Sequence, residues 1–311
     1  MKISVIGSGA MGSLFGGRLA LAGENVVLYD VYREHIDAVN TQGLSIEDAE
    51  TGEITIAHPQ ASSDPESVKN SDVFLIFVKS TNTESVANQF KSYAAPHTIV
   101  LTLQNGLGND AILLEHFGIE RTAIGVTSQG ATFLGPGKIR HAGKGPTHIT
   151  MADGDETKLK DLAAALDRAG FEIHISDTVT SLVWSKLIIN VGINALTAIL
   201  NVKNGQLLEY EDIKQVMADL VKEALLVAKK KCIQLIYDDP LAQVYEVARS
   251  TASNSSSMLQ DFQKSRPTEI DFINGAIVNE AHKLGIEVPV NETLTRIVRT
   301  LDMLHAKKGS I

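Results

Sequence analysis

The chain has 311 residues with a formal net charge of −9, and 44% of its residues are hydrophobic and 21% charged, which is typical of a folded globular protein. Its length exceeds that of a usual single hydrophobic core, so we expect two domains. The negative net charge argues against a nucleic-acid partner, because binding to a phosphate backbone needs clustered Lys and Arg side chains.

The cysteine and histidine content bears on metals and on the cellular compartment. Cys232 is the sole cysteine, which excludes an internal disulfide and a cysteine metal cluster and fits a reducing cytosol. We expect Cys232 to be a small buried apolar residue. The nine histidines show no metal-ligand spacing. We therefore expect no structural metal and a cytoplasmic location.

The first half of the chain alternates strand-like and helix-like segments. Helices are expected from about Ala10 and from about Arg33. Short and almost wholly apolar strands separated by helices indicate a parallel sheet that is covered on both faces. The strand-like segments are KISVIG, NVVLYD, DVFLIFVK and TIVLTLQNG.

Other strand patterns follow in the same half. The stretch GLSIEDAETGEITIAHP predicts a hairpin with Thr51 and Gly52 at its turn. After about Gly125, Gly-Pro and Gly-Lys turn signals between short alternating runs predict antiparallel strands. A helix near residues 157–169 and the strand FEIHIS complete this half.

From Asp177 onward helical spacing dominates to the end of the chain. We therefore place a boundary near Ser176, with an α/β domain over residues 1–176 and an all-helical domain over residues 177–311. Candidate helices span residues 178–200, 211–231 and 294–304. The apolar stretch 187–200 is interrupted by polar residues and is expected to be too short and too polar to span a bilayer, so no membrane partner is expected.

The glycine-rich stretch near the start of the chain carries the first functional signal. GSGAMG, which is Gly7, Ser8, Gly9, Ala10, Met11 and Gly12, matches G-x-G-x-x-G and lies between a predicted strand and a predicted helix. In that place the glycines allow a tight turn, close approach of a pyrophosphate and close helix packing. A signal peptide or membrane anchor is disfavoured, because the glycines and Arg18 interrupt the apolar run. The sequence predicts a Rossmann-type domain that binds a nicotinamide or flavin dinucleotide.

Asp30 stands at the end of the second predicted strand, where a carboxylate accepts hydrogen bonds from the ribose hydroxyls of NAD and repels a 2′-phosphate. Asp30 therefore favours NADH over NADPH. Arg33 lies close enough in sequence to pair with a 2′-phosphate, so use of NADPH stays open.

A second group of candidate functional residues lies in the helical half. Lys186, Asn190 and Asn194 follow at intervals of four, so a helix places them on one face with Thr197 nearby. Most other residues of this segment are apolar, and a buried polar stripe needs partners or a water-filled cleft. Further on, NSSSMLQD and RPTEIDFINGA place Ser257 and Glu269 among apolar residues. By composition alone, these two residues are typical of caps or surface positions.

The chain as a whole resembles the ketopantoate reductase (2-dehydropantoate 2-reductase) family. The similarity covers essentially all of the chain. It rests on GSGAMG, FVKS around Lys79, LQNGLG around Asn105, SKLIINVGINALTA, SSMLQD and TEIDFINGA. Together these stretches are far more specific than the glycine loop alone.

The resemblance implies a role for each matching residue. Lys186 matches the catalytic general acid, and Glu269 matches the acid that orients the lysine and the substrate. Asn105 matches a residue near the cofactor ribose and nicotinamide, and Lys79 matches a lysine in the interdomain cleft. The residues that match substrate-binding positions are Asn190, Asn194, Asn254 and Ser257.

The implied reaction is hydride transfer from NAD(P)H to the keto group of ketopantoate, giving D-pantoate. Relatives also include NAD-dependent D-2-hydroxy acid dehydrogenases that act on branched or aromatic acids such as mandelate. A different alternative, a non-catalytic dinucleotide-binding sensor, is disfavoured because Lys186 and Glu269 are both present. The helical half offers a surface for a possible homodimer. The resemblance thus implies a small-molecule 2-keto acid as the substrate.

Overall fold

The computed structural model describes residues 1–308, which form two compact units. The first unit comprises Met1–Gln104 and Asn109–Val179, and the second comprises Asn105–Gly108 and the chain from Thr180 onward. The expected ranges 1–176 and 177–311 therefore differ from these units most clearly in the loop of residues 105–108. The domain limits themselves stay a prediction.

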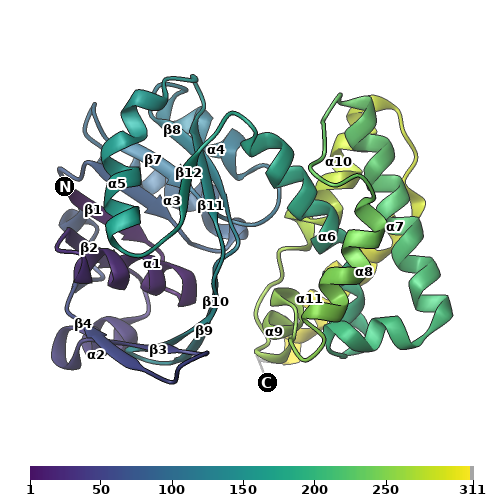
Figure 1. Cartoon of the computed structure of the whole chain (residues 1–311), viewed down its shortest axis with the longest axis horizontal. Helices are drawn as coiled ribbons and strands as arrows, with labels where there is room; N and C mark the ends of the chain where they lie inside the picture. Colours follow the sequence, from purple (N-terminus) through teal and green to yellow (C-terminus); the bar gives the residue numbers. More distant parts are fainter. Residues whose placement is uncertain (309–311) are drawn as a thin grey trace. The chain divides into compact units, whose positions relative to one another are not determined.

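The first unit is built on a largely parallel sheet in the order β12-β11-β8-β7-β6-β1-β2-β5, in which only β8 and β11 pair antiparallel. This confirms the expected α/β class (Figure 1). The strands of this sheet are β1 (Lys2–Ile6), β2 (Asn25–Tyr29), β5 (Gln60–Ser62), β6 (Val73–Ile76), β7 (Ile99–Thr102), β8 (Thr122–Thr127), β11 (Thr147–Met151) and β12 (Ile173–Ile175). The helices of the unit are α1 (Ala10–Leu21), α2 (Arg33–Gln42), α3 (Thr83–Phe90), α4 (Asn109–Phe117) and α5 (Lys160–Arg168), with short 3₁₀ turns η1 (Pro65–Val68), η2 (Ser80–Asn82) and η3 (Glu156–Leu159).

Helices cover both faces of this sheet, which is why its central strands β1, β2, β6 and β7 are largely apolar. Side chains of a strand alternate between the two faces, and here they alternate between two hydrophobic cores. One core joins Val5 and Leu75 to α1 and α5, and the other joins Ile6 and Ile76 to α3 and α4. Because the helices pack on the faces of the sheet, the carboxyl ends of its central strands are followed by loops and not covered by these two cores.

A second, smaller sheet has the order β4-β3-β10-β9. Its strands are β3 (Leu44–Asp48), β4 (Ile54–Ala57), β9 (Gly130–Gly135) and β10 (Lys138–Gly143). The predicted hairpin is confirmed, since β3 and β4 pair antiparallel. The antiparallel pairing predicted after Gly125 is confirmed for β9 with β10 and for β8 with β11. The sequence did not indicate that β10 pairs parallel to β3 and thereby joins the two hairpins.

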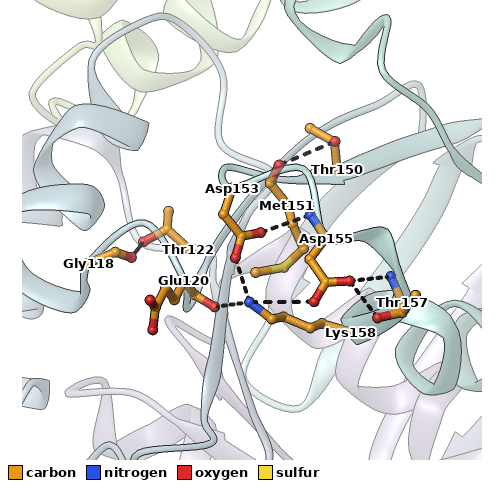
Figure 2. A network of polar contacts seen from close by, with 9 residues as sticks. All are labelled: Gly118, Glu120, Thr122, Thr150, Met151, Asp153, Asp155, Thr157 and Lys158. Atoms are coloured by element: carbon orange, nitrogen blue, oxygen red, sulfur yellow. Dashed lines mark hydrogen bonds and ion pairs between the residues drawn. The ribbon is translucent and has the colours of Figure 1, made fainter.

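A lysine within η3 joins two neighbouring segments of the first unit (Figure 2). Lys158 Nζ lies 2.5 Å from Asp153 Oδ2 and donates to the carbonyl of Glu120 at 3.1 Å. Asp155 caps the same turn, because its carboxylate accepts from the Thr157 backbone. The hydrogen bond from Lys158 is the main cause that lowers the pKa of Asp153. These contacts fasten the turn after β11 to the segment before β8.

The second unit is helical over its described residues, as predicted. Its helices are α6 (Val179–Leu200), α7 (Glu211–Lys230), α8 (Pro240–Ser250), α9 (Ser257–Gln263), α10 (Asn274–Leu284) and α11 (Pro289–Lys308), with turns η4 (Asn204–Glu209) and η5 (Ile270–Phe272). The predicted helices 178–200 and 211–231 are confirmed, whereas the terminal helix begins earlier than residue 294. Cys232 is exposed, so its expected burial was wrong. It lies in a left-handed turn after α7, with φ +59°.

Helix α6 is the one helix of the described residues that is long and apolar enough to cross a membrane by length and composition. The expectation from residues 187–200 was wrong on length, because the helix starts eight residues earlier, at Val179. In the structure 67% of its most apolar window is buried. Core helices of soluble proteins meet the same criteria, so this helix is weak evidence for a membrane span.

Buried polar groups join the helices of the second unit. Asn291, on α11, is fully buried and donates to the carbonyl of Leu220 and to Glu223 Oε2 on α7. Its side-chain oxygen accepts from Asn274 on α10, which also donates to the carbonyl of Val191 on α6. Because buried polar atoms are costly unless they are paired, this network favours one arrangement of the four helices.

Candidate active site

The glycine loop of the first unit requires glycine at its first and last positions. Gly7 has φ +95°, and a Cβ there would lie 2.6 Å from the backbone nitrogen of Val78. A Cβ on Gly12 would lie 2.0 Å from the carbonyl oxygen of Gly7. The loop is therefore drawn tightly against β6 and against its own helix, as the pattern predicts.

The middle of the loop is open. Gly9 is exposed and immediately precedes α1, and no atom lies within 4 Å of a Cβ built on it. Ala10 and Met11, in the first turn, are half-buried. Ser8 is 1% exposed, and its hydroxyl makes no hydrogen bond within the described residues. A buried hydroxyl needs a partner, and a pyrophosphate at this helix start would supply acceptors. The loop thus fits a dinucleotide.

Asp30 lies beside this loop, as its place after β2 predicts. Its Oδ2 accepts the Ser8 N–H at 2.7 Å, and its Oδ1 accepts the Tyr32 N–H at 3.0 Å. Two backbone donors fix the orientation of the carboxylate. Arg33, the first residue of α2, is exposed.

Lys79 follows β6 at the same edge of the sheet. β6 pairs with β1 up to Ile6 and Ile76, and the Phe77 N–H continues the pairing to the Ile6 carbonyl. Lys79 is half-buried and precedes η2. Lys79 therefore lies at the carboxyl end of a parallel strand, the edge at which such sheets bind their ligands.

Asn105 belongs to the second unit by its contacts, although the sequence suggested the first. The adjacent loop packs on η5, where the Leu107 N–H donates to the carbonyl of Phe272 at 2.9 Å. Gly106 has φ +84°, and a Cβ there would lie 2.3 Å from the same carbonyl. Half-buried Asn105 is thereby held near the segment that contains Glu269.

Lys186 and Glu269 come together within the second unit. Lys186 is half-buried on α6 beside buried Leu187, and Glu269 is 6% exposed just before η5. Burial lowers the pKa of Lys186 to about 8, while the charge of Glu269 opposes that shift. A lysine with such a pKa releases a proton near neutral pH far more readily than an exposed one.

The other polar residues of α6 continue from this lysine. Asn190 is half-buried, and Asn194 is 5% exposed with its Nδ2 3.5 Å from the Ser257 hydroxyl. Thr197, one turn further on, shares a hydrogen bond of 2.7 Å with Ser256. Asn194 and Thr197 therefore face the start of α9. Asn254 differs from the rest, because its side chain is exposed and its described contacts run through its backbone.

The structure adds a residue that the sequence did not indicate. Asp302, on α11, accepts from both the N–H and the hydroxyl of Thr268, at 3.2 and 2.8 Å. Burial raises the pKa of Asp302 above its ordinary value, and these hydrogen bonds offset only part of that rise. Thr268 directly precedes Glu269, so Asp302 holds the backbone there. No sequence motif connects these distant positions. Among the described residues, no group of three or more His, Cys, Asp or Glu side chains fits a metal ion.

Comparison with known proteins finds one and the same family for both units. The family model described as "Ketopantoate reductase PanE/ApbA" matches residues 3–154, and that of its C-terminal domain matches residues 178–302. A 2-dehydropantoate 2-reductase of Halobacterium salinarum is 36% identical, over 96% of this chain and 98% of the relative.

Two solved structures are similar over nearly all of this chain. A PanE/ApbA family ketopantoate reductase from Ralstonia eutropha JMP134 has a TM-score of 0.91 and 35% identity, covering 98% of this chain and 100% of that one. A D-mandelate dehydrogenase with NADH and anilino(oxo)acetate has a TM-score of 0.91 and 30% identity, with the same coverage.

The packing of residues 105–108 on η5 predicts unequal effects of two glycine substitutions. Gly106→Ala is expected to destabilise the protein by more than about 2 kcal/mol, because backbone strain and a clash with Phe272 add together. Gly108→Ala is the matched control, since Gly108 also has positive φ, +98°, but has open space around it. Thermal unfolding of the two variants measures the difference. Equal losses would show that the contact with η5 does not matter.

Proposed function

Since the chain belongs to the ketopantoate reductase family, we propose that it reduces ketopantoate to D-pantoate with hydride from a nicotinamide dinucleotide. One observation carries the proposal beyond family membership: Lys186, with its pKa lowered to about 8, lies beside Glu269 in a chain with a dinucleotide loop. A non-catalytic sensor would have no use for such a lysine. The enzyme class is an oxidoreductase that acts on a keto group.

The chemistry of the residues fits keto-acid reduction. A bound nicotinamide supplies the hydride. Negative charge then develops on the carbonyl oxygen of the substrate, and the Lys186 ammonium stabilises that charge and donates a proton from Nζ to the oxygen. An arginine would not serve, because a guanidinium does not release its proton. Lys186 regains a proton from solvent in the next cycle.

The remaining polar residues bind and orient. Glu269 helps to keep the half-buried Lys186 charged, since its carboxylate favours the ammonium form. Asn190, Asn194 and Ser257 offer neutral donors and acceptors for the hydroxyl and carboxylate oxygens of the substrate. We propose the same substrate-binding role for Asn254. For Asn105 and Lys79 we propose contacts with the cofactor.

We propose NADH as the preferred cofactor. Asp30 is held next to the glycine loop by two backbone N–H groups, and a fixed carboxylate there accepts from ribose hydroxyls and repels a 2′-phosphate. Arg33 opposes this preference, because it lies three residues beyond Asp30 on the exposed start of α2. The family uses either nicotinamide dinucleotide.

A second candidate function is a D-2-hydroxy acid dehydrogenase for branched or aromatic acids. The observation that favours it is the D-mandelate dehydrogenase structure, which bears NADH and anilino(oxo)acetate in a similar fold. Lysine and glutamate serve either reaction. The choice depends on apolar contacts to the substrate, where one methylene contributes about 1–3 kcal/mol of discrimination.

We further propose that the enzyme works in the cytoplasm without nucleic-acid or membrane partners. Its negative charge supports the first exclusion, and the burial of α6 supports the second. A homodimer through the helical unit is also proposed.

Steady-state reduction of a substrate panel tests the proposed function. Ketopantoate is expected to give the highest kcat/KM against 2-ketoisovalerate and benzoylformate, and NADH a higher kcat/KM than NADPH at equal concentration. A higher kcat/KM for benzoylformate would show that the enzyme is a D-2-hydroxy acid dehydrogenase rather than a ketopantoate reductase. Equal or better use of NADPH would overturn the role given to Asp30.

The variant Lys186→Ala is expected to lower kcat by roughly 10²–10⁴-fold, the usual contribution of a general acid, while NADH still binds. In the native enzyme the rate is expected to fall as pH rises through about 8, because the ammonium form of Lys186 is lost. Lys222→Ala, at an exposed lysine on α7, is the control and should keep the native rate. Near-native turnover by Lys186→Ala would remove this residue from the mechanism.

A further inference from the structure

A buried histidine in the first unit connects the glycine loop to the small sheet. His35, on α2, is fully buried, and burial lowers its pKa against the opposing charge of Asp30. Its Nδ1 accepts the Gly137 N–H at 3.0 Å, and its Nε2 lies 3.0 Å from the Ser13 hydroxyl. Ser13, on α1, is also fully buried. The glycine motif and Asp30 explain neither residue.

The contacts fix which ring nitrogen carries the proton. A backbone N–H only donates, so the bond from Gly137 makes Nδ1 the acceptor. A neutral imidazole then carries its proton on Nε2, which donates to the oxygen of Ser13. The single proton of Ser13 is thereby left for the carbonyl of Ser8, at 2.8 Å. The result is a directed chain from His35 through Ser13 to Ser8.

This chain orients one peptide unit of the glycine loop. The peptide after Ser8 is trans, and in a planar trans peptide the C=O and the next N–H point in opposite directions. With the Ser8 carbonyl held toward Ser13, the Gly9 N–H faces the opposite side. Gly9 is the exposed residue of the loop. The Ser8 N–H is fixed as well, by Asp30, so both peptides around Ser8 have set orientations.

We infer that His35 is a positioning residue for the dinucleotide: acting through Ser13, it turns the Gly9 amide toward the pyrophosphate. The inference rests on the dinucleotide site of the proposed function and names a residue outside that site. The small sheet acts as the anchor. The Gly137 carbonyl accepts from the Ser45 N–H at 2.8 Å on β3, and the Phe133 ring lies 5.1 Å from the His35 ring. The imidazole is therefore held from β3, β9 and the turn before β10.

Two substitutions of His35 test this inference, because each retains only one of the two hydrogen bonds of the imidazole. The amide nitrogen of His35→Gln replaces Nε2–H and keeps the bond to Ser13. The amide oxygen of His35→Asn replaces Nδ1 and keeps only the bond from Gly137. NADH affinity of the full-length protein, measured by titration calorimetry without substrate, is expected to fall roughly fivefold or more in His35→Asn and in Ser13→Ala, one hydrogen bond's worth. His35→Gln should stay close to the native value.

The double variant His35→Asn with Ser13→Ala is expected to bind no more weakly than either single variant, because both break the same chain. Thermal unfolding separates positioning from folding: His35→Asn and His35→Gln should lose similar stability while differing in NADH affinity. His58→Gln, at an exposed histidine of the same unit, is the control.

Equal NADH affinities for the Asn and Gln variants, additive losses in the double variant, or native affinity in Ser13→Ala would each overturn the inference. If the native protein binds neither NADH nor NADPH, both this inference and the proposed dinucleotide site would be overturned. Failure of the proposed substrate would leave NADH binding, and thus this inference, standing. The two proposals therefore fail separately.

Discussion

A lysine ammonium that is partly removed from water is the constraint on which the second unit depends. Transfer of a charge from water is costly unless an opposite charge compensates. Glu269 supplies that charge to Lys186, yet the pKa of the lysine still falls to about 8. The pair is thus balanced so that the lysine is charged at neutral pH and holds its proton loosely, which is what a general acid requires.

That balance requires a rigid support, because an electrostatic interaction in a poorly solvated site changes steeply with distance. The segment around Glu269 is fastened on both sides. Thr268 bonds to Asp302, Asp271 pairs with Arg299 at 2.6 Å, and the Phe272 carbonyl accepts from the loop of residues 105–108. On the other side, the network around Asn291 holds α6 among its neighbouring helices. The first unit follows the same logic, since Asp30 and Ser13 hold the two peptides around Ser8.

The features that are local in the chain could be predicted from the sequence. Apolar strands between helices gave the α/β class, and glycine spacing located the loop, because the steric need at Gly7 and Gly12 arises within one strand-turn-helix unit. The spacing of four in α6 likewise placed Lys186, Asn190 and Asn194 on one stripe. Contacts between distant segments could not be predicted. The grouping of Asn105 with η5, the bonds of Asp302 to Thr268 and the contact of His35 with Gly137 all depend on tertiary packing. The exposure of Cys232 was not predicted, because the expectation used how often cysteines are buried in general, and this one lies in a turn after α7.

The most direct test of this account is the titration of Lys186 itself, followed by NMR of isotope-labelled lysine side chains in the native protein and in Glu269→Gln. The account predicts a native pKa near 8 and a lower one in the variant, because loss of the carboxylate removes the group that favours the ammonium. A native pKa near the ordinary 10.5, or a value that does not fall in Glu269→Gln, would contradict it.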